Sequence, residues 1–272
     1  MDYNMFSIRN RVICVTGGSG GIGSGIAEGL AGLGAKVVIL GRNADKLATV
    51  EKNILERTGV RIRWYAADIT DEQSVEDVFE RIYQELGSFY GLVNCAGTTC
   101  VSPLNEMPLE RWQDVMDVNI KGTVICCKAA GKYMLRQKEG RIVNISSLAA
   151  THGKPGYTAY TPSKAAVNAF TFTLAAEWAR MGINVNSVAP ALVVTDINRK
   201  LVESDSGYVD KVLSTIPNGK LCGAQELLGV IVFLLSPASG YITGQNIGCD
   251  GGSQNGDIAV IKPIETMQGE KQ

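Results

Sequence analysis

The sequence contains one histidine, His152, and its seven cysteines include no CxxC pair. Zinc sites are built from clustered Cys and His ligands, so no metal centre is predicted. A Ser/His/Asp triad is not expected either, because His152 is the sole imidazole base in the chain. We interpret His152 as a loop residue or a wall of the substrate pocket, and the cysteines as free, mostly buried thiols in a reducing compartment.

The chain also lacks an excess of charge and a long apolar run. Its 26 Lys and Arg residues balance 27 Asp and Glu residues, so no basic surface for nucleic acid or anionic lipid is expected. The longest apolar run, residues 230–235, is far shorter than the roughly 20 residues that span a bilayer. Residues 1–10 show no apolar signal segment. We therefore expect a cytoplasmic protein that binds no nucleic acid and no membrane.

Short apolar runs alternate with amphipathic segments along the chain. Parallel strands need crossover connections, and these bury the sheet on both faces. The alternation predicts a doubly wound α/β fold, with a seven-stranded parallel sheet and helices on both faces, in a single domain over residues 1–252. Residues 253–272 form an extension whose apolar part, 258–261, could pack on a neighbouring subunit or fray. The expected strands are 11–16, 36–40, 62–67, 91–96, 141–146, 183–189 and 244–250, and the expected helices are 21–34, 44–58, 71–87, 108–136, 157–181 and 224–236.

A glycine-rich segment, TGGSGGIG at residues 16–23, follows the first strand and opens the first helix. Gly18, Gly20 and Gly23 fit the GxGxxG spacing, and Gly17, Gly21 and Gly23 fit the related TGxxxGxG spacing. Glycines let the backbone approach a pyrophosphate, which the helix N-terminus attracts. Such a turn could serve close helix packing alone, but its position favours dinucleotide binding.

The second strand is followed by Arg42 and lacks the acid that an NAD site offers to the ribose 2′-hydroxyl. A guanidinium there suits a 2′-phosphate, so the predicted cofactor is NADP; the alternative is a solvated loop arginine. After the third strand, Asp68 could accept a hydrogen bond from an adenine amino group. After the fourth, the small residues 94–97 would let a ring lie against the backbone. Asp68 and 94–97 could also be turn or cap residues.

Tyr160 stands four residues before Lys164 in the segment YTPSK, a spacing that places both side chains on one helix face. Pro162 lies between them, and proline is tolerated only in a first helical turn, so the pair is predicted at a helix start. Ser147, at the end of the fifth strand, precedes Tyr160 by thirteen residues. A phenol titrates near ~10, and a nearby lysine ammonium is expected to lower that pKa towards working pH.

Taken together, these motifs resemble the short-chain dehydrogenase/reductase family over residues 9–252. The resemblance rests on TGGSGGIG, NCAG (94–97), VNIKG (118–122), Ser147, YTPSK, and Pro190 with Thr195 in PALVVT. It implies a Rossmann-type fold and a catalytic set in which Tyr160 donates and accepts the proton, Ser147 holds the substrate oxygen, Lys164 binds the nicotinamide ribose, and Asn119 helps to anchor a water. The implied cofactor-binding residues are Gly17, Ser19, Gly21, Ile22, Gly23, Arg42, Asp68, Ile69, Asn94, Ala96, Gly97, Tyr160, Lys164, Pro190, Val193 and Thr195.

The chain departs from the family pattern after Pro190, where Ala191 replaces the usual glycine, and in the extension beyond residue 252. Overall similarity to gluconate 5-dehydrogenases predicts a small-molecule substrate, namely a sugar acid, ketose or polyol, and family precedent predicts a homotetramer. One alternative is a 3-oxoacyl-thioester reductase, whose acidic carrier could dock on the basic stripe of Lys128, Lys132 and Arg136. Another is a dinucleotide-binding sensor without turnover. A lid is expected over about 191–222, where Arg199 and Lys200 could meet an anionic substrate or remain solvated.

Overall fold

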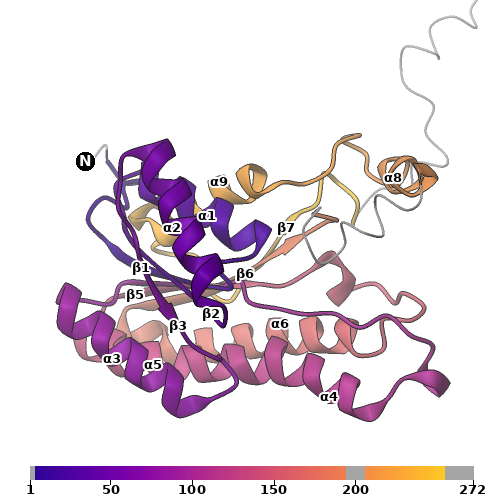
Figure 1. Cartoon of the computed structure of the whole chain (residues 1–272), viewed down its shortest axis with the longest axis horizontal. Helices are drawn as coiled ribbons and strands as arrows, with labels where there is room; N and C mark the ends of the chain where they lie inside the picture. Colours follow the sequence, from indigo (N-terminus) through magenta and orange to yellow (C-terminus); the bar gives the residue numbers. More distant parts are fainter. Residues whose placement is uncertain (1–3, 194–205, 255–272) are drawn as a thin grey trace, which may run out of the picture.

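The fold is built on one parallel sheet of seven strands, in the order β3-β2-β1-β4-β5-β6-β7 (Figure 1). The structure is a computed structural model that describes residues 4–193 and 206–254. The strand order reverses between β1 and β4, and crevices for ligands form at such switch points, beyond the carboxyl ends of the strands. The strands are β1 (Val12–Thr16), β2 (Lys36–Gly41), β3 (Arg63–Ala66), β4 (Gly91–Asn94), β5 (Gly140–Ile145), β6 (Ile183–Pro190) and β7 (Asn246–Cys249).

Helices cover both faces of the sheet (Figure 1). One layer holds α1 (Gly21–Gly32), α2 (Ala44–Thr58) and α9 (Ala224–Leu235), and the other holds α3 (Glu72–Leu86), α4 (Leu109–Met116), α5 (Gly122–Gln137) and α6 (Tyr160–Trp178). A further helix, α8 (Ser206–Leu213), lies apart from both layers. Among the described residues, no helix combines the length and apolar character needed to cross a bilayer.

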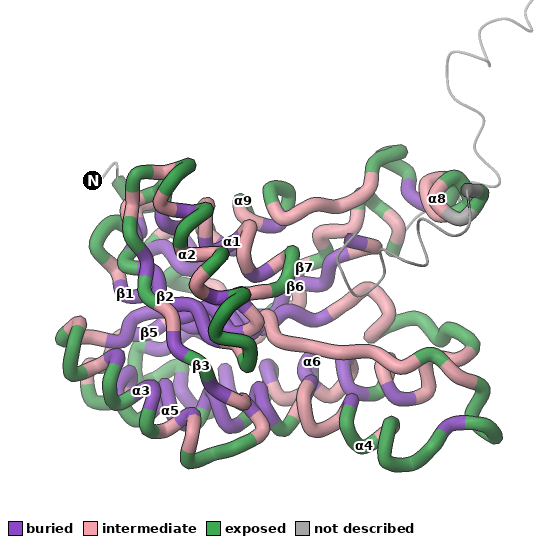
Figure 2. The backbone as a smooth tube through the Cα atoms, in the orientation of Figure 1, coloured by how far each residue is buried: buried purple, intermediate pink, exposed green. Residues whose placement is uncertain are grey.

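Two apolar cores lie on opposite faces of the sheet, and the strands supply both (Figure 2). Ile13 and Val15 of β1 face the core under α1 and α9, whereas Val12 and Cys14 face the core under α3 and α5. Every residue of β1 is buried for this reason. A strand covered on both faces needs apolar side chains in both directions, which explains the continuous apolar runs in the sequence.

Local signals set several helix ends. Asn43 caps α2 by accepting a hydrogen bond from the amide of Lys46, and Asp71 caps α3 through the amide of Ser74. Both helices stop at a left-handed glycine, where a side chain would be strained. Such caps explain why the boundaries expected for α2 and α3 agree with the structure to within one residue at each end.

The predicted doubly wound fold is confirmed, with two changes in its helices. The expected helix 108–136 is divided by a π-helical segment, η2 (Asp117–Lys121). The expected helix 157–181 begins at Tyr160 and ends in a short 3-10 turn, η4 (Ala179–Met181). Several predicted features lie outside the described residues, namely Thr195, Arg199, Lys200 and the apolar part of the extension, 258–261.

Candidate active site

The carboxyl ends of β1 and β4 are tied together by one hydroxyl group. Thr16 Oγ1, at the end of β1, accepts hydrogen bonds from the amides of Cys95 and Ala96, both at 3.1 Å. Thr16 is buried, so the two amides after β4 are satisfied without solvent at this point. The bonds fix the chain after β4 against the glycine turn, at the switch point of the sheet.

The glycine turn between β1 and α1 has no room for a side chain at Gly17 or at Gly23. Gly17 has a left-handed φ of 67°, and a Cβ there would lie 2.7 Å from the Cα of Ala96. A Cβ on Gly23 would lie 2.3 Å from the carbonyl oxygen of Gly17. The helix that follows starts at Gly21 and has no side-chain cap on its first amides. This arrangement fits a dinucleotide, whose pyrophosphate binds free amides at a helix N-terminus.

A hollow of about 320 Å³ lies beyond the ends of β2 and β3. Arg42 follows β2, and the carboxylate of Asp68, after β3, accepts bonds from the amide and hydroxyl of Thr70 at 2.9 and 2.8 Å. The hydrogen bond from the Thr70 amide is the main cause that lowers the pKa of Asp68. Burial raises this pKa, whereas the hydrogen bond from the Thr70 hydroxyl and the positive charge of Arg42 lower it further. The lining residues are Arg42, Asp68, Thr70, Thr98, Thr99, Arg111, Asp114, Val115, Asp117 and Val118.

The polarity of this hollow fits the adenosine end of NADP. Thr99 Oγ1 is buried there and has no hydrogen-bond partner among the described residues. Arg42 supplies a cation at the position where an NAD site would carry an acid, and Asp68 supplies an acceptor. An anionic phosphate beside Arg42 and a base amino group beside Asp68 would match these charges.

The side chains of Ser147 and Tyr160 are joined by a hydrogen bond. Ser147 Oγ also accepts from the amide of Ala149 at 3.1 Å, which caps the 3-10 turn η3 (Leu148–Ala150) and orients the hydroxyl. Tyr160 is the first residue of α6, as the position of Pro162 predicts. The predicted position of Tyr160 at a helix start is therefore confirmed, and Ser147 lies just after β5, close to the predicted strand end.

The expected direction of the Tyr160 pKa shift is wrong for this chain. Burial raises the pKa of Tyr160 above its ordinary value, and this outweighs the Ser147 hydrogen bond that lowers it; Tyr157 and Cys95 raise it further. The expectation considered the lysine alone and left out burial, which disfavours the charged phenolate. Tyr160 is therefore a protonated phenol at neutral pH and is suited to donate its proton.

Lys164 is buried beside Tyr160, with its Nζ 5.9 Å from the centroid of the phenol ring. The Nζ donates a hydrogen bond to the carbonyl oxygen of Ile145, the last residue of β5, at 2.8 Å. Burial lowers the pKa of Lys164 to about 8. Lys164 is thus a cation that loses its proton just above neutral pH, and its Nζ is held by the backbone of the sheet.

Asn119 lies in the π-helical segment η2 and connects the loop after β4 to α6. Its Oδ1 accepts from the amide of Thr98 at 2.8 Å, and its Nδ2 donates to the Thr98 carbonyl at 3.0 Å and to Ser163 Oγ at 2.9 Å. A Cβ on Gly97 would lie 3.3 Å from Asn119 Oδ1 and 3.5 Å from Lys164 Nζ. Asn119, Gly97 and Lys164 therefore meet at one place.

Asn94, Pro190, Val193 and Ser19 are predicted site residues that lie away from Tyr160 in the sequence. The Asn94 side chain is buried and donates to Asn144 Oδ1 and to Cys127 Sγ, so it points into the core. Pro190 ends β6, and Val193 lies beyond it in a short bridge to Cys222. Ser19 lies near Gly41 at the end of β2, because a Cβ on Gly41 would be 3.1 Å from Ser19 Oγ.

Thr16, Thr98, Ser163 and the carbonyl of Ile145 support the site but were not expected to do so. Thr16 and Ser163 stand inside the recognised motifs, and the motifs could have indicated them. The Lys164 contact with Ile145 joins residues nineteen positions apart through a backbone atom, so no residue type marks it. Within the described ranges, no three His, Cys, Asp or Glu side chains gather to hold a metal ion.

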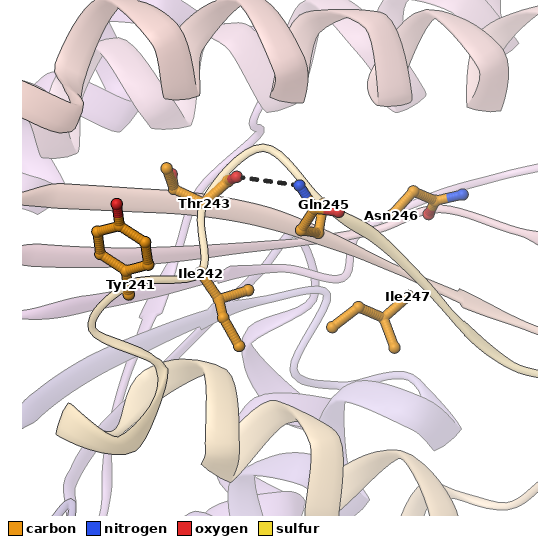
Figure 3. A pocket seen from close by; sticks show the side chains of 6 residues that line it. All are labelled: Tyr241, Ile242, Thr243, Gln245, Asn246 and Ile247. Carbon is orange, nitrogen blue, oxygen red and sulfur yellow. Dashed lines mark hydrogen bonds between the residues drawn. The ribbon is translucent and has the colours of Figure 1, made fainter.

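A second hollow, of about 420 Å³, lies along the edge strand β7 and is formed by other residues (Figure 3). Its lining includes Tyr241, which is fully exposed, and Gln245, whose side-chain amide donates to the carbonyl of Thr243 at 3.3 Å. The lining carries no carboxylate, lysine or arginine. The site with acid and base groups is therefore the one at the carboxyl ends of β1 to β5.

Comparison with known proteins agrees with this placement. Residues 11–206 match the family model of short chain dehydrogenases. A gluconate 5-dehydrogenase from Gluconobacter oxydans is 34% identical over 92% of this chain and 96% of its own. A 3-oxoacyl-[acyl-carrier-protein] reductase from Synechocystis is 37% identical over 91% of this chain and 98% of its own. The solved structure of a gluconate 5-dehydrogenase from Burkholderia cenocepacia, in complex with NADP and tartrate, superimposes with a TM-score of 0.88 at 31% identity, over 93% and 99% of the two chains.

Proposed function

This chain belongs to the short-chain dehydrogenase family, and on that premise we propose that it interconverts the ketone and the secondary alcohol of a sugar acid, ketose or polyol. It is an NADP-dependent oxidoreductase that acts on CH-OH and carbonyl groups. The observation that carries the proposal is the hydrogen bond between Ser147 and Tyr160 beside the buried Lys164. Binding alone has no need of such a polarised phenol.

Tyr160 is the proposed acid and base. In the reductive direction the phenol donates its proton to the carbonyl oxygen, which the Ser147 hydroxyl holds by a hydrogen bond. In the oxidative direction the phenolate takes the proton of the alcohol. When bound, the reduced cofactor NADPH would supply the hydride for reduction, and NADP⁺ would accept it in oxidation. The raised pKa of Tyr160 keeps its proton available at neutral pH, which suits reduction.

Lys164 and Asn119 support that proton transfer. The Lys164 ammonium stabilises negative charge that develops on the phenol, and in our proposal it also donates to the nicotinamide ribose. Asn119 fixes the loop at Thr98 and, through Ser163, the first turn of α6. We propose that it also helps to anchor a water next to Lys164, so that the phenol can be reprotonated.

The residues proposed to hold NADP lie along the carboxyl edge of the sheet. Gly17, Ser19, Gly21, Ile22 and Gly23 would hold the pyrophosphate, and Arg42 the 2′-phosphate. The remaining contacts would come from Asp68, Ile69, Asn94, Ala96, Gly97, Pro190, Val193 and Thr195, the last of which lies outside the described residues. Asn94 can take part through its backbone, because its side chain bonds to Asn144 and Cys127.

Small polar acids are the substrate class that we propose for this chain. The similar proteins include gluconate 5-dehydrogenases, and the Burkholderia cenocepacia structure is a complex with NADP and tartrate. Near Tyr160, the chain carries the exposed cation Lys154, whose Nζ lies 4.7 Å from the Tyr157 ring centroid. We propose that Lys154 attracts the carboxylate of a substrate bound at Tyr160.

A 3-oxoacyl-thioester reductase is the second candidate, because one such enzyme is 37% identical to this chain. The basic stripe expected to dock its carrier is weaker than the sequence indicates. Lys128 forms an ion pair with Glu72 of α3. Of the three cations in the stripe, Lys132 and Arg136 therefore remain outside this pair. The ion pair therefore lowers the net positive charge of the suggested docking surface.

A substrate panel tests both candidates. Keto-sugar acids, ketoses, small ketones and a 3-oxoacyl thioester are each assayed for loss of NADPH absorbance. Turnover of keto-sugar acids or ketoses supports the proposal, and turnover of the thioester alone selects the second candidate. No turnover across the panel would contradict both substrate assignments.

We also propose that the chain assembles as a homotetramer. Phe172 of α6 and Val124 of α5 are 47% and 36% exposed, although both are large apolar residues on neighbouring helices of one layer. Burial of such side chains between copies of a chain favours association. Light scattering should give the mass of four chains, and a monomer at micromolar concentration would overturn the assignment.

A further inference from the structure

Two half-buried cysteines from distant parts of the sequence meet near the end of β7. Cys249 is the last residue of β7, and Cys222 lies just before α9. Their thiols are hydrogen-bonded to each other. Both sulfurs also reach backbone carbonyls at the start of α9, with Cys222 Sγ 3.7 Å from the Gly223 oxygen and Cys249 Sγ 3.5 Å from the Glu226 oxygen.

These cysteines flank a segment next to the proposed nicotinamide site. Cys249 pairs with Pro190 in the sheet, and its carbonyl accepts the amide of Ala191 at 3.3 Å. On the other side, Cys222 forms a parallel bridge with Val193. Any change in the distance between the two cysteines therefore acts on residues 190–193 through direct backbone contacts.

The two thiols differ in reactivity. The hydrogen bond with Cys222 lowers the pKa of Cys249 to about 7, against the opposing effects of burial and of the carboxylates of Asp250 and Glu226. The same hydrogen bond, together with burial, raises the pKa of Cys222. Cys249 thus has the character of an attacking thiolate, and Cys222 that of a thiol that resolves the product.

The remaining cysteines lack this combination of accessibility and partner. Cys14, Cys126 and Cys127 are fully buried in the core between the sheet and α3 and α5. Burial raises the pKa of Cys95 to about 12, although Lys164 opposes this. Cys100 is half-buried like Cys222 and Cys249 but lies in a different loop. It therefore provides a control of matched accessibility.

We propose that Cys222 and Cys249 form an oxidation-sensitive pair, which a hydroperoxide converts to an intramolecular disulfide that reversibly slows the enzyme. The Cys249 thiolate attacks one peroxide oxygen, the O–O bond breaks, and the leaving oxygen departs as water or alcohol after taking a proton. The Cys222 sulfur then attacks the Cys249 sulfenic acid, which releases a second water. Two thiols lose two electrons in total, and the peroxide is reduced by the same two electrons.

The effect on turnover follows from the geometry of the cross-link. Two sulfurs in hydrogen-bond contact must approach to about 2.05 Å when the bond forms. That contraction draws the loop before α9 towards β7 and displaces residues 190–193, which are bonded to both. Small displacements at a reacting centre reduce rates strongly, so the oxidised enzyme should have a kcat lower by about twofold or more.

The test uses the full-length protein, reduced and then treated with hydrogen peroxide in small molar excess. Remaining thiols are alkylated, and peptides are mapped by mass spectrometry without reduction. Cross-linked peptides that contain Cys222 and Cys249 are expected, with the thiol count falling from the seven of the reduced chain to five. Dithiothreitol should restore both the thiols and kcat.

Variants separate the two roles. In Cys222→Ser, a sulfenic-acid probe should label Cys249 and no cross-link should form, whereas in Cys249→Ser residue Cys222 should stay reduced. Cys100→Ser should behave like the native protein. Peptide mapping of the native protein alone decides the chemistry if a variant fails to fold. The proposed disulfide would be wrong if Cys222 and Cys249 could still be alkylated after Cys100 has been oxidised, or if the cross-link joined two subunits. A complete cross-link with unchanged kcat would show that the disulfide does not control turnover.

Discussion

The Lys164 ammonium lies 5.9 Å from the centroid of the Tyr160 ring, and the two side chains project from successive turns at the start of α6. The helix fixes their separation at one end, and the hydrogen bond from Lys164 to the last carbonyl of β5 fixes it at the other. The lysine is thus held by the sheet and not by the phenol. Each group can therefore be removed without releasing the other, which makes their roles separable by mutation.

Replacing Tyr160 with Phe should abolish turnover and leave NADPH affinity nearly intact. The change removes the proposed proton donor but keeps the ring and the Lys164 contact, and loss of one acid-base group typically costs ~10²–10⁴ in rate. Steady-state kinetics and NADPH binding by fluorescence measure the two effects. Tyr157→Phe is the matched control, because Tyr157 packs edge-on against Tyr160 at 5.9 Å and lacks the proposed role. Near-normal turnover in Tyr160→Phe would remove Tyr160 from the mechanism.

Replacing Lys164 with Ala should lower kcat and also weaken NADPH binding. The proposed lysine serves both the phenol and the nicotinamide ribose, so one change affects two measurements. Tyr160→Phe provides the contrast, since it should affect kcat alone. If Lys164→Ala changes kcat while the NADPH dissociation constant stays at the native value, the proposed ribose contact is wrong.

The pH profile of ketone reduction should break near the pKa of Lys164. Burial lowers the pKa of Lys164 to about 8, so the ammonium is charged below that pH and loses its proton above it. The phenol of Tyr160 stays protonated through the same range, because its pKa is raised. We expect kcat/KM for reduction, which reports groups of the free enzyme, to be level at neutral pH and to fall above pH 8.

Ser147→Ala provides the control for that profile. It should lower the whole curve, because the proposed hydrogen bond to the substrate oxygen is lost, and leave the break at the same pH. A profile that keeps rising above pH 8 would show that charged Lys164 is not required for reduction.

Replacing Arg42 with Ala should reduce NADPH affinity by one to two powers of ten and change NADH affinity little. Charge-assisted hydrogen bonds contribute ~1.5–3 kcal/mol, which corresponds to that change in the dissociation constant. Raising the ionic strength should weaken the native preference for NADPH, because Arg42 is exposed. Arg42→Asp should penalise NADPH further through repulsion of the phosphate.

Lys46→Ala is the control for Arg42, since Lys46 is another exposed cation, in the first turn of the helix that follows. It should leave both dissociation constants unchanged. An equal change for the two cofactors in Arg42→Ala, or a native preference for NADH, would contradict the role of Arg42 at the 2′-phosphate.

Replacing Thr16 with Val should destabilise the protein without a large change in shape. The substitution removes the acceptor for the Cys95 and Ala96 amides, and an unsatisfied buried group costs about 1–3 kcal/mol. Urea unfolding measures the loss. Thr49→Val, which removes an exposed hydroxyl bonded to a helix carbonyl, should cost less. Equal losses for the two variants would mean that the Thr16 bonds add no stability.

Patterns along the chain predicted the fold and the positions of Ser147, Tyr160 and Lys164 well, because each depends on local chemistry. Continuous apolar runs mark strands that are buried on both faces, and Pro162 marks the first turn of α6. The direction of the Tyr160 pKa shift could not be predicted in the same way. It depends on how deeply the surrounding chain buries the phenol, which is a property of packing.

Local sequence patterns also could not predict that Asn119 lies in a π-helical segment. Apolar spacing predicts one helix across residues 108–136, and no residue type at 117–121 marks the π-helical segment between the two helices. What distinguishes the segment is the set of bonds from Asn119 to Thr98 and Ser163, both distant in sequence. Only the assembled fold brings these partners together.

The π-helical segment between α4 and α5 has a consequence for how this gene can change. A π-helical turn holds one residue more than the α-helical turn it replaces. The loss of one codon at 117–121 can therefore be absorbed as an ordinary α-helical turn, which leaves Ile125 and Cys126 of α5 buried against the sheet. The same loss would shift Asn119 relative to Thr98 and Ser163, its hydrogen-bond partners. A one-residue deletion in this gene is thus expected to keep the fold and to disturb the site.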